Sequence, residues 1–303
     1  MGTAAVTHPL RALNQAELIR LARVADRLLS GRPKITPGNR PHKLRAGHGI
    51  EFLDHRAFMQ GDNLRDIDWR ATARSRTPQI RRFRNETSSD WFICLDRSAS
   101  MSLGDGRKWG LAIQLTAALA YLLIHLDNRV GLLTFSDRID GFKPLGRGHH
   151  TYAALLRLLE STSPRSSGGD TLLHSCASQL QSGSQIIVIS DFLTSDSLQP
   201  GLKLLAGIGE DVHAVQVLDE HETTLTQSGL LSLRDIETNR RISIHHTAEV
   251  QKQAEEQLGK LSKNLRQHCH KYQIAFTSCT TAENWKTILL DHLTSLGLFN
   301  AKL

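Results

Sequence analysis

The sequence has few cysteines and no long uninterrupted run of hydrophobic residues. Four cysteines at wide, irregular intervals predict neither a disulfide framework nor a zinc knuckle; they are Cys94, Cys176, Cys269 and Cys279. The longest apolar stretch, residues 111–126, is interrupted by polar side chains and is too short to cross a bilayer. The N-terminus lacks the pattern of a secretory signal. We therefore expect a cytoplasmic protein without a membrane span, for which peripheral association with a membrane through a partner stays open.

The sequence also lacks several motifs of common enzymes. It contains neither the GxxxxGK[ST] pattern of P-loop ATPases nor the GxSxG elbow of serine hydrolases. Gly104–Gly110 contains three glycines, but it starts eight residues after Asp96, whereas a dinucleotide fingerprint starts where the strand ends. These absences give no support to a P-loop ATPase, a serine hydrolase or a dinucleotide-binding enzyme.

Positive charge is concentrated in the first third of the chain. The chain of 303 residues has 37 Lys and Arg against 30 Asp and Glu, a formal charge of +7. Residues 1–90 hold 17 basic and 9 acidic residues, whereas residues 91–303 hold 20 and 21. We predict a basic N-terminal extension over 1–90 and a separate domain over 91–303. No aromatic residue precedes Phe52, which disfavours base stacking, so docking onto an acidic protein is the preferred role of the extension.

The second part of the chain alternates strand-like and helix-like segments. Short, almost continuous apolar runs predict strands buried on both faces of a parallel sheet; they cover residues 91–96, 130–135, 186–191 and 212–219. Helix-length segments separate or follow them at 108–126, 152–160, 172–180, 198–206, 248–271 and 282–298, with a further strand at 274–278. This alternation predicts an α/β fold with a doubly wound, mostly parallel sheet of Rossmann type. Residues 220–247 are expected to form a small β-rich insertion.

Oxygen-bearing side chains follow the ends of the predicted strands. Ligands of open α/β sheets bind outside the carboxyl ends of the strands. Asp96 is followed by hydroxyls at Ser98 and Ser100, directly before a helix, and Thr171 and Asp191 lie in later loops. Carboxylate and hydroxyl oxygens are ligands for Mg²⁺, with Mn²⁺ or Ca²⁺ as alternatives. The competing interpretation is helix capping, which uses the same residue types.

These five positions match a known signature. The set resembles the metal-ion-dependent adhesion site of von Willebrand factor A domains, which reads DxSxS, then a distant Thr, then an Asp. The matching residues are Asp96, Ser98, Ser100, Thr171 and Asp191. The resemblance implies a von Willebrand factor A-like domain. It also implies a protein-binding function, in which a Glu or Asp of the partner completes the coordination of the metal.

The segment before this domain carries a second resemblance. Residues 56–74 resemble the R-x-Y-x-x-G-D-x-x-R-x-I-D-W-x-x-x-A-R run of the bacterial family called domain of unknown function 58, with Phe58 in place of Tyr. Members are commonly paired with MoxR-type AAA+ ATPases. The resemblance implies an adaptor that works with such an ATPase in assembling, remodelling or activating client proteins.

Two other functions remain as alternatives. Asp62, Asp66 and Asp68 could serve a metal-dependent hydrolase or nuclease, if they converged on a metal. Arginines alternate with these aspartates, so mutual neutralisation is the simpler explanation. The basic N-terminal residues allow a nucleic-acid-binding protein, although the acidic residues among them repel a phosphate backbone.

Overall fold

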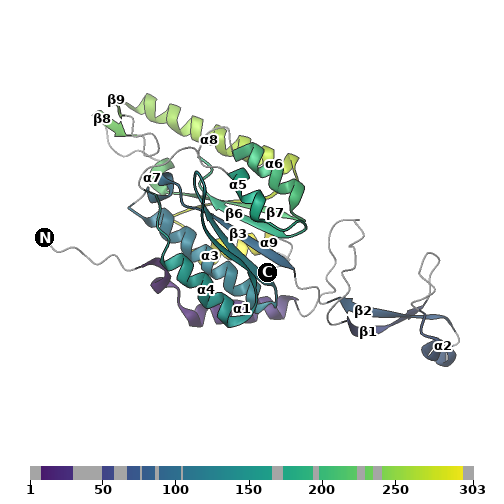
Figure 1. The fold of residues 1–303 in the computed structure, drawn as a ribbon. Coiled ribbons are helices and arrows are strands. Elements are labelled where there is room, and N and C mark those ends of the chain that lie inside the picture. The colour runs from purple at the N-terminus through teal and green to yellow at the C-terminus, as the bar shows by residue number, and fades with distance from the viewer. Residues whose placement is uncertain are drawn as a thin grey trace. The chain divides into compact units, whose positions relative to one another are not determined.

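The computed structural model describes residues 8–29, 50–57, 67–75, 77–85, 89–103, 105–165, 173–193, 198–223, 229–234 and 241–295. The chain divides into two compact units (Figure 1). The larger unit contains Met1–Leu29 and Ser89–Leu303, and the smaller contains Ser30–Ser88. The second segment of the larger unit starts at Ser89, next to the domain boundary that we predicted after residue 90. The first 29 residues, which we placed in the extension, belong to that larger unit as well.

A six-stranded sheet in the order β10-β7-β6-β3-β4-β5 forms the centre of the larger unit. Its strands are β3 (Asp90–Asp96), β4 (Arg129–Phe135), β5 (Ile139–Gly146), β6 (Gln185–Ser190), β7 (Val212–Leu218) and β10 (Ala275–Thr280). All neighbouring pairs are parallel except β4 and β5. The predicted mixed α/β class with a mostly parallel sheet is therefore confirmed.

Helices lie on both faces of this sheet (Figure 1). One layer comprises η1 (Pro9–Ala12), α1 (Gln15–Leu29), α3 (Arg107–His125), α4 (Gly148–Glu160) and α9 (Trp285–Ser295). The other comprises α5 (Leu173–Cys176), η4 (Ala177–Gln179), α6 (Leu198–Ile208) and α8 (Ala248–Lys271). The shorter elements η3 (Ala99–Ser102), α7 (Glu220–Thr223), β8 (Gly229–Arg234) and β9 (Arg241–His246) lie in the connections. The antiparallel pair β8–β9 confirms the predicted β-rich insertion.

The strand β3 shows how the apolar runs produce these two layers. Successive side chains of a strand point to opposite faces. Ile93 and Leu95 join the core beneath α3, and Phe92 and Cys94 join the core beneath α5 and α6. All four are buried. A strand covered on both faces has no position for a solvated side chain, which is why the run is apolar throughout.

The order of the strands reverses between β3 and β6. From β3 the chain continues to β4 and β5 on one side, and β6 and β7 then occupy the other side. In open α/β sheets, such a point of reversal is where ligands bind, outside the carboxyl ends of the strands. Asp96 ends β3 and Asp191 directly follows β6. The topology thus brings together two predicted site residues that lie far apart in the sequence.

The smaller unit contains an antiparallel pair of strands and a short helix. β1 (Ile50–Ala57) pairs with β2 (Gln79–Asn85), and α2 (Trp69–Ser75) precedes β2. Thr72 Oγ1 accepts a hydrogen bond from Gln79 N at 2.9 Å, which fixes α2 to the start of β2. The unit therefore has local structure of its own.

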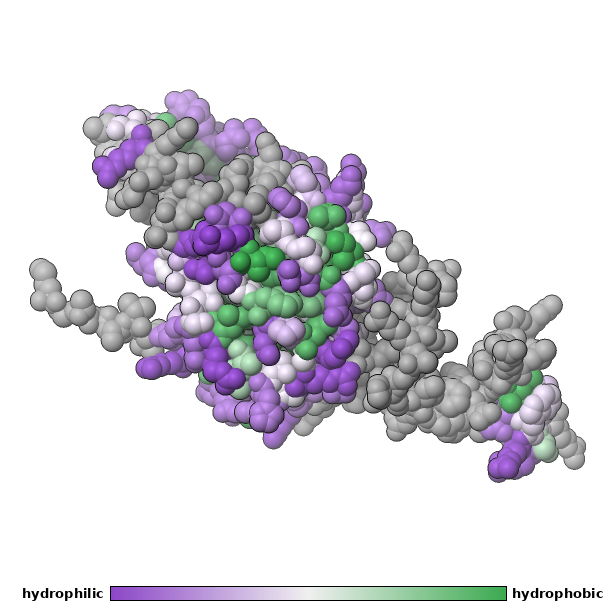
Figure 2. All heavy atoms as spheres, in the orientation of Figure 1, coloured by the Kyte–Doolittle hydropathy of each residue, from purple (hydrophilic) through white to green (hydrophobic). Residues whose placement is uncertain are grey.

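The surface of the larger unit carries both hydrophobic and hydrophilic residues. Figure 2 shows hydrophobic residues near the middle of the visible face of the larger unit, bordered by hydrophilic residues. Within the described ranges, no helix is both long enough and apolar enough to cross a membrane. All four cysteines are buried free thiols.

Candidate metal centre

The loop after β3 places a buried carboxylate beside two hydroxyls. Asp96 is fully buried, and its Oδ1 accepts a hydrogen bond from Ser98 N at 2.7 Å. Ser98 stands at the N-cap position of η3, but its side chain makes no capping hydrogen bond. Instead Ser98 Oγ lies 3.0 Å from Ser100 Oγ. The capping interpretation of this motif therefore does not account for the Ser98 hydroxyl.

The turn after β6 brings the second carboxylate to the same place. Ser190 Oγ donates to Asp96 Oδ2 at 2.6 Å, and it accepts a hydrogen bond from Phe192 N at 3.0 Å. Phe192 has a φ of 53°, in the left-handed region. That conformation costs a residue with a Cβ about 1–2 kcal/mol. The strained turn holds Asp191, which is fully buried, next to Asp96.

Two buried carboxylates next to each other repel. Burial, followed by the negative charge of Asp191, raises the pKa of Asp96 to about 7. Hydrogen bonds from Ser190 and Ser98 act in the opposite direction and are too weak to compensate. A cation close to Asp96 would relieve this repulsion.

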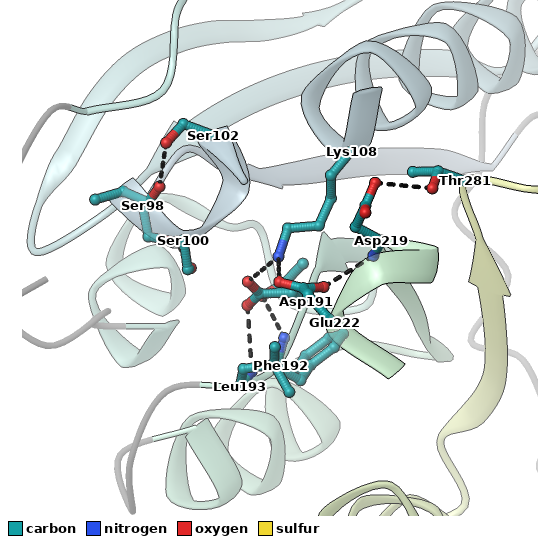
Figure 3. Close-up of polar contacts among 12 residues, drawn as sticks. Ser98, Ser100, Ser102, Lys108, Asp191, Phe192, Leu193, Asp219, Glu222 and Thr281 are labelled. Carbon is teal, nitrogen blue, oxygen red and sulfur yellow. Dashed lines mark hydrogen bonds and ion pairs between the residues drawn. The ribbon is translucent and has the colours of Figure 1, made fainter. Parts of the chain in front are cut away.

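A lysine that the sequence analysis did not single out lies on the other side of Asp191. Lys108 extends from the first turn of α3, and its Nζ donates to Asp191 Oδ2 at 2.8 Å and to Glu222 Oε1 at 2.6 Å (Figure 3). Its side chain is fully buried. Burial disfavours the ammonium, but the two carboxylates outweigh that effect and raise the pKa of Lys108 above its usual value. Lys108 is thus a charged group inside the site.

Glu222 connects the site to α7. Its Oε2 accepts a hydrogen bond from Asp219 N at 2.8 Å, while Oε1 binds Lys108. Asp219, which directly follows β7, accepts a hydrogen bond from Thr281 Oγ1 at 2.9 Å and lies 3.5 Å from Arg107. Asp219 therefore has a hydroxyl and a cation beside it, which favours a structural role for this aspartate.

The Ser98 and Ser100 hydroxyls are within hydrogen-bond distance of each other, and their spacing is also compatible with two ligands of one magnesium ion. Oxygens in adjacent positions of an octahedron, each about 2.1 Å from the metal, lie about 3.0 Å apart. The two Oγ atoms show that separation. In the described part of the chain, no group of three or more His, Cys, Asp or Glu side chains is arranged to hold a metal. A site here would thus combine two carboxylates with hydroxyls and water, a donor set that fits Mg²⁺.

The remaining predicted residues divide into two groups. Thr171, Asp62 and Asp66 lie outside the described residues. Asp68 caps α2, because its Oδ1 accepts hydrogen bonds from Arg70 N at 2.9 Å and Ala71 N at 3.1 Å. The N-cap thus accounts for one of the three aspartates of the hydrolase alternative.

Sequence comparison finds relatives that are described as uncharacterized proteins. The family described as "Protein of unknown function DUF58" matches residues 54–263. The uncharacterized proteins Mb1516 of Mycobacterium bovis and Rv1480 of Mycobacterium tuberculosis are each 27% identical to this chain over 199 residues. The match covers 63% of this chain and 62% of each relative, so the chain spans less than two thirds of their length.

Among solved structures, the chain resembles the conserved hypothetical protein BatB of Bacteroides thetaiotaomicron at 18% identity and a TM-score of 0.39, over 69% of this chain and 99% of that one. It also resembles an aerotolerance-related membrane protein of Bacteroides fragilis at 16% identity and a TM-score of 0.44, over 69% and 98%. Both similarities are too distant to indicate a shared function. The family match, in contrast, covers more than half of the chain, and the protein belongs to the DUF58 family.

Proposed function

We propose that this protein is a metal-dependent protein–protein interaction adaptor, built on a von Willebrand factor A-like domain, and not an enzyme. Asp96, Ser98, Ser100, Thr171 and Asp191 would hold Mg²⁺, directly or through water. A Glu or Asp of a partner protein would take a remaining coordination position. The metal would supply a bridge between the two proteins.

One observation carries the proposal. At the reversal point of the sheet, two fully buried carboxylates, Asp96 and Asp191, lie beside each other and next to a pair of hydroxyls 3.0 Å apart. A buried carboxylate pair is costly unless a cation or a proton compensates it. Together with Lys108, which is bound to Asp191 and Glu222, a divalent ion would balance all three carboxylates, and it would use both hydroxyls.

The proposal also concerns the identity of the partner protein. The family resemblance of residues 56–74 favours a MoxR-type AAA+ ATPase or a client that such an ATPase remodels. An acidic side chain of the partner is the chemical requirement, because Mg²⁺ prefers oxygen ligands and keeps exchangeable waters that a carboxylate can replace.

Capture of a purified MoxR-type ATPase from the same organism on the immobilised full chain tests the proposal. We expect retention with Mg²⁺, and loss of retention with a chelator or with Asp96→Ala, whose unfolding should remain cooperative. Ser102→Ala is the matched control, since its hydroxyl lies in the same loop but donates to Ala99 O at 2.7 Å. Retention that survives both chelation and Asp96→Ala would refute the metal bridge.

A further inference from the structure

Lys108 stands where a cation-binding site would not normally have a fixed cation. Buried lysines are rare unless they are paired, and this one is paired with a residue that we assign to the metal. Its Nζ is 2.8 Å from Asp191 Oδ2 and 2.6 Å from Glu222 Oε1. Asp191 Oδ1 is also engaged, because it accepts a hydrogen bond from Leu193 N at 3.2 Å.

We propose that Lys108 is an internal cation that competes with the divalent ion for Asp191 and thereby sets how tightly the site binds metal. This inference rests on the metal-binding function proposed above and concerns the regulation of the same site. The ammonium shares its charge between Asp191 and Glu222, so a metal that enters needs to take over only the contact to Asp191. Glu222 remains as the partner of Lys108.

Two effects of Lys108 on metal affinity oppose each other. Hydrogen bonds to a metal ligand orient it, and losing one typically weakens binding by about 10- to 100-fold. The ammonium is also a positive charge, and it would be bound to the same Asp191 carboxylate as the metal ion. At an effective dielectric constant of about 20, the repulsion between a single and a double charge at such short range exceeds the orienting effect. Removing the charge should therefore tighten metal binding.

The charge also matters for the partner. Mg²⁺ and Lys108 together balance Asp96, Asp191 and Glu222, so an arriving carboxylate meets a neutral site. Without Lys108 the same site with its metal would carry one net negative charge, which would repel the carboxylate. Lys108 would thus weaken metal binding by the free protein and favour an acidic partner.

Mg²⁺ titration of the full chain by calorimetry tests this inference. Lys108→Met keeps a long unbranched side chain and removes the charge, and we expect its Mg²⁺ affinity to rise at least tenfold. Lys108→Arg keeps the charge and should bind within threefold of the natural protein. Glu222→Gln leaves the ammonium to Asp191 alone and should bind Mg²⁺ at least threefold more weakly. A gain in affinity is informative because loss of structure cannot produce it.

The outcomes separate this inference from the proposed function. If the natural protein binds Mg²⁺ and folded Lys108→Met binds it equally or more weakly, the competition is refuted while the metal site stands. If Lys108→Met does not fold, Glu222→Gln decides, and unchanged or tighter binding by that variant refutes the competition. If neither the natural protein nor Lys108→Met binds Mg²⁺, the metal site itself is wrong and both proposals fail.

Discussion

Two parallel strands of the sheet lead into buried aspartates, β3 into Asp96 and β7 into Asp219. Asp219 accepts a hydrogen bond from Thr281 and lies beside Arg107. Asp96 accepts hydrogen bonds from Ser98 and Ser190, and its charged neighbour is another carboxylate, Asp191. The same position at a strand end thus has a hydroxyl and a cation beside it in one place and a second buried carboxylate beside it in the other. The surroundings, and not the aspartate itself, distinguish a cap from a candidate ligand.

The largest effect is expected for Asp96→Asn. It removes one of the two charges that attract the metal, so we expect Mg²⁺ affinity to fall at least 100-fold. Because it also removes the repulsion with Asp191, the metal-free thermal midpoint should stay equal or rise. Calorimetric titration and thermal unfolding measure both quantities. A large drop in the metal-free midpoint would mean that Asp96 is structural, as Asp219 is.

Asp219→Asn should show the opposite pattern. It leaves Arg107 and Thr281 without their buried carboxylate, so we expect a loss of about 1–3 kcal/mol in the free energy of unfolding. Mg²⁺ affinity should change less than tenfold. Denaturant unfolding with the same titration provides the measurement. If Asp219→Asn lost as much Mg²⁺ affinity as Asp96→Asn, the two aspartates would not differ in the way that we propose.

The raised pKa of Asp96 predicts a pH dependence of stability. Between about pH 4 and 7 the native state holds a proton that the unfolded chain releases, so this group's contribution to stability is present at low pH and is lost as pH rises through about 7. For one proton, the free energy of unfolding cannot change by more than about 1.4 kcal/mol per pH unit. Unfolding of the metal-free protein, compared with Asp96→Asn from pH 5 to 8, measures it. Equal pH profiles would show that Asp96 does not titrate there.

Ser102→Ala is expected to have the smallest effect. Its hydroxyl is bonded to Ala99 O and contributes about 1 kcal/mol or less to stability. Ser100→Ala, in contrast, removes a proposed ligand and should lower Mg²⁺ affinity at least tenfold. Titration of the two variants side by side checks that the hydroxyls of this loop differ. Equal affinities would show that Ser100 is not a ligand.

The fold was predictable where burial is uniform. We could predict β3, β4, β6 and β7 from their apolar runs alone, because a strand that is covered on both faces is apolar throughout. β5 was missed because Ile139–Gly146 is a partly exposed edge strand that includes Gly141 and Pro144, both atypical of a strand interior. The predicted helix over 172–180 is instead two short elements, α5 and η4.

The sequence indicated the oxygen-bearing side chains of the candidate site but not the lysine beside them. Spacing and strand ends identify Asp96, Ser98 and Asp191, because the topology of a parallel sheet decides where they meet. Lys108 was missed, since a lysine at the start of a helix normally extends into solvent. Its burial follows from Asp191 and Glu222, which lie 83 and 114 residues further along the chain. No local pattern contains that information.

The most direct test of the account is the location of the metal. Crystals of the full chain grown with Mn²⁺, whose anomalous scattering marks its position, should show one strong peak among Asp96, Ser98, Ser100 and Asp191. The same crystals of Asp96→Asn should lack it. Ordered density for these side chains without a peak, or a peak at another place only, would contradict the proposed metal centre.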